Sequence, residues 1–142
     1  MLVAQILKTK GDQVFTCGPD HSLAEAAGLL HTHKVGAVVV MRDERVAGIL
    51  SERDMVRAVA RDGASALERE VAHYMTADVI FARPQESVDA LMERMTDRRI
   101  RHLPVCENER LLGIVSIGDL VKTKIAETTH EAETLKAYIS AG

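Results

Sequence analysis

The sequence contains two copies of one pattern, separated by 65 residues. The stretch GILSERD, from Gly48 to Asp54, recurs as GIVSIGD, from Gly113 to Asp119. The same separation relates four further pairs, which are Val14 and Val79, Pro19 and Pro84, Ser22 and Ser87, and Val40 and Val105. A shorter likeness, between VAQIL from Val3 and VAHYM from Val71, has a separation of 68. An internal repeat of this length predicts two similar units that pack on each other.

Each copy predicts the element order β-α-β-β-α. Short apolar strands are expected at 14–16 and 79–81, and the following helices begin after the N-cap residues Ser22 and Ser87. Each helix carries apolar residues at i, i+3, i+4 and i+7, which is a single buried stripe. The stripe consists of Leu23, Ala26, Ala27 and Leu30 in the first copy and of Val88, Leu91, Met92 and Met95 in the second.

Two more strands and a helix complete each copy. Apolar runs at 38–40 and 103–105 lead into polar turns, and the second strand ends in the repeated motif, after which a helix begins at Asp54 or Asp119. The predicted fold class is therefore α+β, with two small sheets that each need a partner to cover them. We expect a first module at 1–62, a linker at 63–70, a second module at 71–126 and a C-terminal tail at 127–142. The tail is predicted to be an amphipathic helix that docks through Leu135, Tyr138 and Ile139 on the body or on a second subunit.

The amino-acid composition limits the kinds of binding partner that we expect. Hydrophobic residues make up 46% and charged residues 27% of the 142 residues, which is typical of a globular protein and not of a disordered one. The net charge is −3 and aromatic residues make up 3%, so nucleic acid is not an expected partner. We expect neither a membrane span nor a signal peptide, and we predict a cytoplasmic protein. Cys17 and Cys106 lack metal-like spacing and are expected to be free thiols.

The repeated Ser-x-x-Asp pattern has two interpretations. Ser51 with Asp54, and Ser116 with Asp119, have the spacing of a capping box, which only stabilises the start of a helix. The same junction also presents free N–H groups at a helix N-terminus, which attract a phosphate. A carboxylate beside them is suited to the vicinal hydroxyls of a ribose, as in dinucleotide-binding folds.

These paired motifs, together with RHLPV from Arg101 to Val105, resemble a tandem pair of CBS domains, named for cystathionine β-synthase. The resemblance covers about Val3 to Ile125. It implies two modules packed sheet to sheet about a pseudo-twofold axis, with two clefts that commonly bind adenosine-containing ligands. AMP is the ligand we expect first, with ATP, ADP, NAD(H) and S-adenosylmethionine as alternatives. The chain resembles small stand-alone bacterial members, which implies a homodimer and an effector protein that responds to it.

The resemblance also implies roles for individual residues. Asp54 and Asp119 match the ribose-binding acid, and Ser51 and Ser116 match the hydroxyl residue that contacts phosphate or the ribose edge. The residues that match strand segments approaching the adenine are Gly36, Ala37, Val38, His102, Leu103 and Pro104. The residues that match strand starts lining the clefts are Thr16 and Ile80.

The two clefts are not expected to be equivalent. The first motif contains Arg53, whereas the second contains Gly118, which allows close backbone approach to a ligand. Arg101 and His102 are expected to neutralise a phosphate, Arg101 with a bidentate fork. Arg98 is expected to be a solvated charge at a helix end.

Two functions follow from the sequence. One is a regulatory module that senses an adenine nucleotide and signals to a partner protein. The other is an interaction scaffold in which the Ser-x-x-Asp motifs only cap helices. We favour the sensor, because a scaffold gains nothing from Arg53, Gly118 and Arg101 beside the two aspartates. No nucleophile, base and orienting group can be proposed from spacing, so we expect no enzyme, no catalytic cofactor and no metal site.

Overall fold

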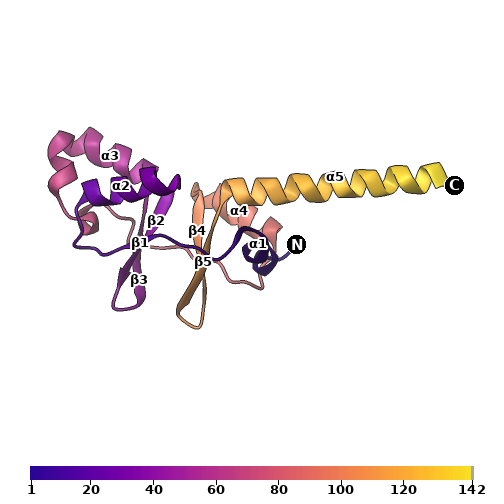
Figure 1. The fold of residues 1–142 in the computed structure, drawn as a ribbon, viewed down its shortest axis with the longest axis horizontal. Coiled ribbons are helices and arrows are strands. Elements are labelled where there is room, and N and C mark those ends of the chain that lie inside the picture. Colours follow the sequence, from indigo (N-terminus) through magenta and orange to yellow (C-terminus); the bar gives the residue numbers. More distant parts are fainter. Residues whose placement is uncertain (142) are drawn as a thin grey trace.

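The computed structural model describes residues 1–141. Its first half contains α1 (Val3–Lys10), β1 (Thr16–Cys17), α2 (Leu23–His33), β2 (Ala37–Arg42), β3 (Arg45–Ser51) and α3 (Glu52–Asp62). The short 3₁₀ helices η1 (Gly63–Glu68) and η2 (Val71–His73) follow, and then come α4 (Val88–Arg98), β4 (His102–Glu107), β5 (Arg110–Ser116) and α5 (Ile117–Ala141). The strands form two sheets, β1-β2-β3 and β4-β5, which lie side by side in Figure 1. The predicted α+β class is confirmed.

The repeat in the sequence is also a repeat in backbone geometry. Ala37 pairs with Ser51 in the first hairpin as His102 pairs with Ser116 in the second. Both hairpins turn through two residues with positive φ, which matches the right-handed twist of the paired strands. These residues are Asp43 and Glu44 in the first copy and Asn108 and Glu109 in the second.

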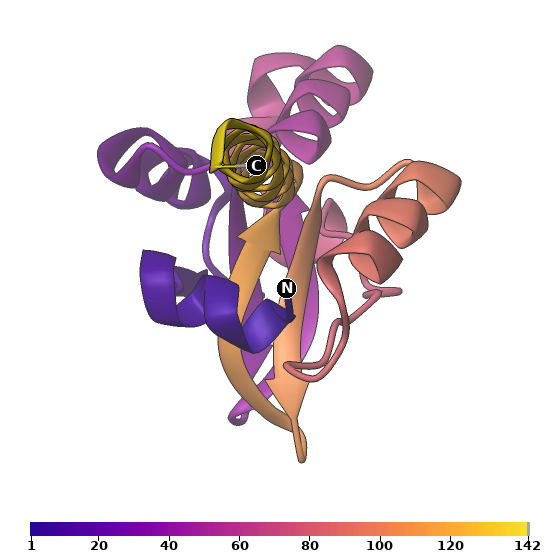
Figure 2. The ribbon, with the colours of Figure 1, turned by 90° about the vertical axis from the view of Figure 1, so that its right-hand side faces the viewer.

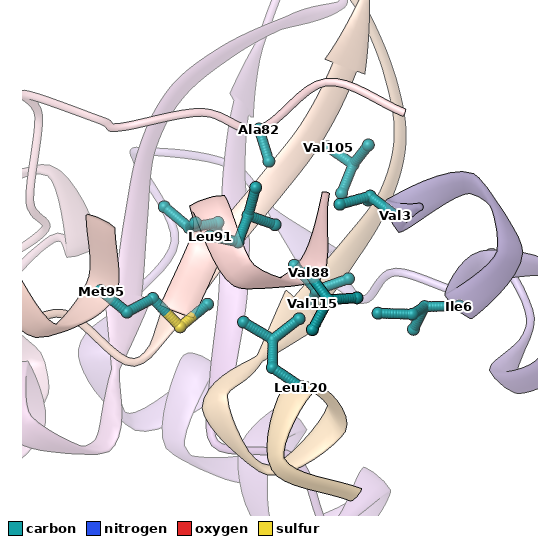
Figure 3. Packing of buried hydrophobic residues seen from close by; sticks show 10 residues of the cluster. Val3, Ile6, Ala82, Val88, Leu91, Met95, Val105, Val115 and Leu120 are labelled. Carbon is teal, nitrogen blue, oxygen red and sulfur yellow. The ribbon is translucent and has the colours of Figure 1, made fainter. Parts of the chain in front are cut away.

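The N-terminal segment of each copy packs on the other copy. Val3 and Ile6 of α1 belong to the core of the second copy, and Figure 3 shows them next to Val88, Val115 and Leu120. Conversely, Val71 of η2 is fully buried in the core of the first copy. Each core therefore includes a segment of the other predicted module, 1–62 or 71–126, because sequence repetition does not say which sheet a segment covers. The module limits themselves stay a prediction.

This exchange explains why glycine recurs in the repeated motif. A Cβ added at Gly113 in β5 would lie 2.7 Å from a methyl group of Leu7 in α1. At Gly48 in β3 it would lie 2.6 Å from the sulfur of Met75 and 2.9 Å from the carbonyl oxygen of Thr76. Both distances are too short for a real side chain, so the two glycines let the crossing segments lie directly on the strands.

The two sheets face each other across the middle of the molecule. Strands β3 and β5 are in contact, and Arg45 at one hairpin tip forms an exposed ion pair with Glu109 at the other, at 3.6 Å. Figure 2, which looks along the long axis, shows the sheet of the second copy in front of that of the first. The predicted sheet-to-sheet packing of two related modules is confirmed.

The prediction of a strand at 79–81 is wrong. In the first copy the Val39 N–H donates to the Phe15 carbonyl at 3.0 Å and holds β1 against β2. The residue equivalent to Val39 is Pro104, which has no N–H to donate. Only a single bridge between Ala82 and Val105 remains at this edge of the second sheet.

Two segments between and after the predicted modules are helical. The predicted linker, 63–70, is mostly covered by η1, and Ala66 is fully buried in the first core. Helix α5 runs without a break from Ile117 to Ala141, so the predicted tail from 127 continues the last helix of the second copy. Figure 1 shows α5 extending well beyond the rest of the molecule. Gly142 lies outside the described residues.

Candidate functional site

A cleft of about 850 Å³ lies between the two copies. One wall is formed by the end of β3 and the first turn of α3, and the other by the end of α4 and the start of β4. Its volume falls in the usual range for small-molecule sites, which is roughly 300–1,000 Å³. Six predicted site residues line it, namely Gly36, Ser51, Arg53, Asp54, Arg101 and His102.

Asp54 is the buried charge in this cleft, with 6% of its surface exposed. Its Oδ2 accepts hydrogen bonds from the Ser51 N–H at 2.9 Å and from the Ser51 hydroxyl at 3.1 Å, which completes a capping box with Ser51. Its Oδ1 has weaker partners, the Thr76 hydroxyl at 3.3 Å and an Arg57 nitrogen at 3.6 Å. Oδ2 therefore holds the start of α3, whereas Oδ1 has only the two longer contacts.

Sequence reasoning missed Thr76 and Arg57, although both line the cleft. Arg57 lies one turn after Asp54 in α3, so its place on the same helix face could be read from the spacing. Thr76 comes from the crossing segment and reaches Asp54 because the backbones of Thr76 and Ile49 exchange two hydrogen bonds, at 2.9 and 3.0 Å. Nothing in the sequence pairs those two residues.

Arginine side chains dominate the polar lining of the cleft. Arg53 and Arg57 come from the first copy, and Arg98, Arg99 and Arg101 come from the second. The Arg53 guanidinium donates to the Arg99 carbonyl oxygen at 3.4 Å and so spans the two copies. Five guanidinium groups against the carboxylates of Glu52 and Asp54 give the cleft a positive balance suited to an anion such as phosphate. Arg98 is exposed at the C-terminal end of α4, as predicted, and it also lies in this lining.

His102 contributes an imidazole ring. Its imidazole packs against Gly36, where an added Cβ would lie 3.0 Å from Nε2. Burial lowers the pKa of His102 below its usual value, although Glu52 and Asp119 act in the opposite direction. A lowered pKa favours the uncharged imidazole, whereas Arg101 carries a positive charge at this edge; that His102 neutralises a phosphate stays a prediction.

The aspartate of the second motif, Asp119, has a different hydrogen-bond partner from Asp54 in the first. The Ser116 N–H donates to Asp119 Oδ2 at 2.8 Å, as in the first copy, but the Lys10 ammonium also donates to this oxygen, at 2.6 Å. Lys10 is fixed further by the carbonyl oxygen of Ile114, at 2.9 Å. Burial alone would raise the pKa of Asp119, but the hydrogen bonds from Lys10 and Ser116 bring it below its usual value. The charge of Asp119 is thus neutralised within the chain.

The remaining predicted site residues do not line the cleft between the copies. Ser116 ends β5, and Gly118 and Asp119 lie in the first turn of α5; within residues 1–141, Ile117 is the one residue of α5 that lines that cleft. Four others have buried side chains, namely Ala37, Val38, Leu103 and Pro104. Thr16 is exposed on β1, and Ile80 packs against the second core. These nine residues therefore stay apart from the arginine-lined cleft, and sequence matching alone does not separate them from the six that line it.

Residues 1–141 contain no cluster of three or more histidine, cysteine or carboxylate residues that could hold a metal ion. No helix among these residues is both long enough and apolar enough to span a membrane.

Comparison with known proteins identifies the architecture. The sequence matches the CBS domain twice, at residues 3–61 and 71–125. The chain is similar to the CBS domain-containing protein CBSX3, mitochondrial, of Arabidopsis thaliana, with 34% identity over 99% of this chain and 72% of the relative.

Two solved structures have the same fold. The CBS-domain containing protein ATU1752 from Agrobacterium tumefaciens is 51% identical, with a TM-score of 0.85 over 87% of this chain and 99% of that one. The CBS domain pair of protein MJ0100, in complex with 5'-methylthioadenosine and S-adenosyl-L-methionine, is 26% identical, with a TM-score of 0.80 over 89% of this chain and 98% of that one. Since the two family matches together span most of the sequence, the chain belongs to the CBS domain family.

Proposed function

We propose that this protein is a regulatory module that binds an adenine nucleotide in the arginine-lined cleft and signals the occupancy to a partner protein. The observation that carries the proposal is Asp54: its carboxylate is buried in the cleft, yet only one of its oxygens is committed to the helix cap. A ribose offers two neighbouring hydroxyls that can donate to Oδ1, as they do to the acid of dinucleotide-binding folds.

The arginines select among adenosine-containing ligands. MJ0100, a relative with the same fold, binds 5'-methylthioadenosine and S-adenosyl-L-methionine, neither of which carries a phosphate. In this chain the cleft has five arginines, which favour an anionic ligand and disfavour the positive sulfonium group of S-adenosylmethionine. AMP is therefore the ligand we propose first, followed by ATP and NAD(H).

The contact of Arg53 with the Arg99 carbonyl oxygen can couple ligand binding to the arrangement of the two copies. A phosphate in the cleft offers Arg53 a charged partner in place of a neutral one, and charge-assisted hydrogen bonds are roughly twice as strong. The bound ligand would then replace a direct contact between the two copies. A ligand that favours one arrangement over the other shifts the population of states that a partner protein encounters.

The scaffold remains a second candidate because both capping boxes are formed, one by Ser51 with Asp54 and the other by Ser116 with Asp119. The substitution Asp54→Asn separates the two functions. An asparagine can direct its carbonyl oxygen at the Ser51 N–H and keep the cap, but it then presents an NH₂ donor to the ligand in place of an acceptor.

The experiment is a thermal-shift comparison of the native chain and Asp54→Asn with AMP, ATP, NADH and S-adenosylmethionine. At a ligand concentration of a hundred times Kd the native chain gains about 2.7 kcal/mol, which is a clear rise in Tm. We expect the phosphorylated ligands to raise Tm, S-adenosylmethionine to raise it least, and Asp54→Asn to abolish the rise while its ligand-free Tm stays near that of the native chain. No shift in either protein would favour the scaffold, and equal shifts in both would show that the ligand binds without the Asp54 carboxylate, which contradicts the proposed site.

A further inference from the structure

Helix α5 carries a surface that the molecule itself does not cover. Near its start it packs on the second copy through Leu120, which is fully buried, and through an ion pair of Lys124 with Asp89 at 2.9 Å. Glu127 makes the last of these contacts, with the N-terminal amino group at 3.0 Å. From Thr128 to Ala141 every residue is exposed, and Figure 1 shows this part of α5 projecting away from the body.

The uncovered part has the periodicity of a coiled coil. Starting at Val121, a line of apolar or small residues follows the helix at intervals of 4, 3, 4, 3 and 4, which is a repeat of 3.5 residues. We call this line the α5 seam; it consists of Val121, Ile125, Thr128, Ala132, Leu135 and Ile139. Its large members are well exposed, at 62% for Ile125, 59% for Leu135 and 68% for Ile139. At 1.5 Å per residue the seam is about 27 Å long.

The direction of the seam leaves room for a second copy of the chain. Successive helix residues are rotated by about 100°, so Leu120, Lys124 and Glu127, which face the body, lie about a quarter turn away from the seam. In a pair of parallel α5 helices related by a twofold axis, the two bodies then lie on opposite sides of the helix pair. The seams can therefore meet without collision of the bodies.

The charges that flank the seam favour the parallel direction. In a parallel pair, Glu131 beside Ala132 of one helix lies next to Lys136 beside Leu135 of the other, and the twofold axis repeats this attraction. In the antiparallel pair that overlaps the whole seam, Glu131 would face its own copy and Lys122 would face Lys136. Both of those contacts join like charges.

We propose that the α5 seam is the interface of a homodimer, formed by two parallel α5 helices as a short coiled coil. Thr128 and Ala132 form its narrow central layers, and the larger residues close it at both ends. This interface shares no residue with the arginine-lined cleft, so the dimer proposal is tested separately from the proposed nucleotide sensor.

Sedimentation tests whether the seam joins two chains. We expect the native chain to have twice the mass of the 15.6 kDa monomer, and Leu135→Glu to sediment as the monomer. The matched control is Ala137→Glu, which adds the same charge to the same turn on the opposite side of the helix and should remain dimeric. Because Leu135 is exposed in the single chain, circular dichroism should show the same fold and Tm for the body in both variants.

Crosslinking tests the direction. In the parallel pair Leu135 lies beside its own copy, so Leu135→Cys should form a disulfide-linked dimer on oxidation, whereas the native chain, with Cys17 buried and Cys106 half-buried, should not. In the antiparallel pair Leu135 would face Ile125 instead, so only a mixture of Ile125→Cys and Leu135→Cys chains would crosslink.

Three results would overturn the proposal. The first is a native chain that is monomeric at every protein concentration, and the second is crosslinking only in the mixed antiparallel pair. The third is a dimer that survives Leu135→Glu but is broken by Val56→Glu, which would move the interface to the exposed face of α3.

Discussion

Replacing Lys10 by methionine should destabilise the protein by about 1 kcal/mol at pH 7. The Lys10 ammonium bonds both Asp119 Oδ2, at 2.6 Å, and the Ile114 carbonyl, at 2.9 Å. Hydrogen bonds to charged groups contribute about 1.5–3 kcal/mol when well formed. The side chains of Lys10 and Asp119 are 33% and 23% exposed, so solvent screening reduces this amount. Methionine keeps the packing of the aliphatic stem and removes only the charge.

The pH dependence of this difference follows from Asp119. Its folded pKa lies below the unfolded value of about 3.9, so its contribution to stability is present above that value and is lost as the pH falls through the folded pKa. The difference in unfolding free energy between the native chain and Lys10→Met should therefore be constant from pH 7 to about pH 5 and should shrink below about pH 4.

Urea unfolding at a series of pH values, together with an NMR titration of the Asp119 carboxyl carbon, measures both effects. The control is Lys8→Met, which removes an exposed charge from the same turn of α1; within residues 1–141 Lys8 forms no ion pair. The reasoning is refuted if Lys8→Met and Lys10→Met lower the stability equally. It is refuted as well if the Asp119 pKa in the native chain is at or above about 3.9.

Two further predictions concern the packing between the copies. Gly48→Ala should cost about 1–3 kcal/mol in urea unfolding, since its Cβ would lie 2.9 Å from the Thr76 carbonyl oxygen, whereas Gly28→Ala in open space on α2 should stabilise the protein; equal effects would contradict the packing argument. Pro104→Val should restore a donor for the Ile80 carbonyl and extend the pairing at 79–81, seen as slow exchange of the new amide hydrogen; rapid exchange of that amide would show that proline is not what shortens the strand.

Sequence reasoning succeeded where a residue acts on its near neighbours. Ser22, Ser51 and Ser87 cap helices as predicted, because a cap is a bond across three residues whose pattern is visible in the sequence. The equal separation of the two motifs was enough to predict two related sheets. Pro104 also carries a readable signal against a strand partner, because proline has no N–H to donate.

The rest of the site depends on contacts between segments far apart in the chain. Lys10 and Asp119 are separated by 109 residues, and Thr76 reaches Asp54 only because the crossing segment lies on β3. Two motifs with the same residues therefore have different partners, a hydroxyl in one and an ammonium in the other. The sequence predicted that the two clefts differ through Arg53 and Gly118. The structure adds a second difference: α1 packs on the second copy and brings Lys10 to Asp119.

The most direct test of the proposed sensor is a calorimetric titration of AMP into the native chain, Asp54→Asn and Asp119→Asn. The account predicts binding by the native chain, a loss of at least tenfold in affinity for Asp54→Asn, which corresponds to about 1.4 kcal/mol, and little change for Asp119→Asn. Asp119→Asn is the matched control because it makes the same change at the equivalent position outside the arginine-lined cleft. If Asp119→Asn abolishes binding and Asp54→Asn does not, or if AMP fails to bind the native chain, the central claim is contradicted.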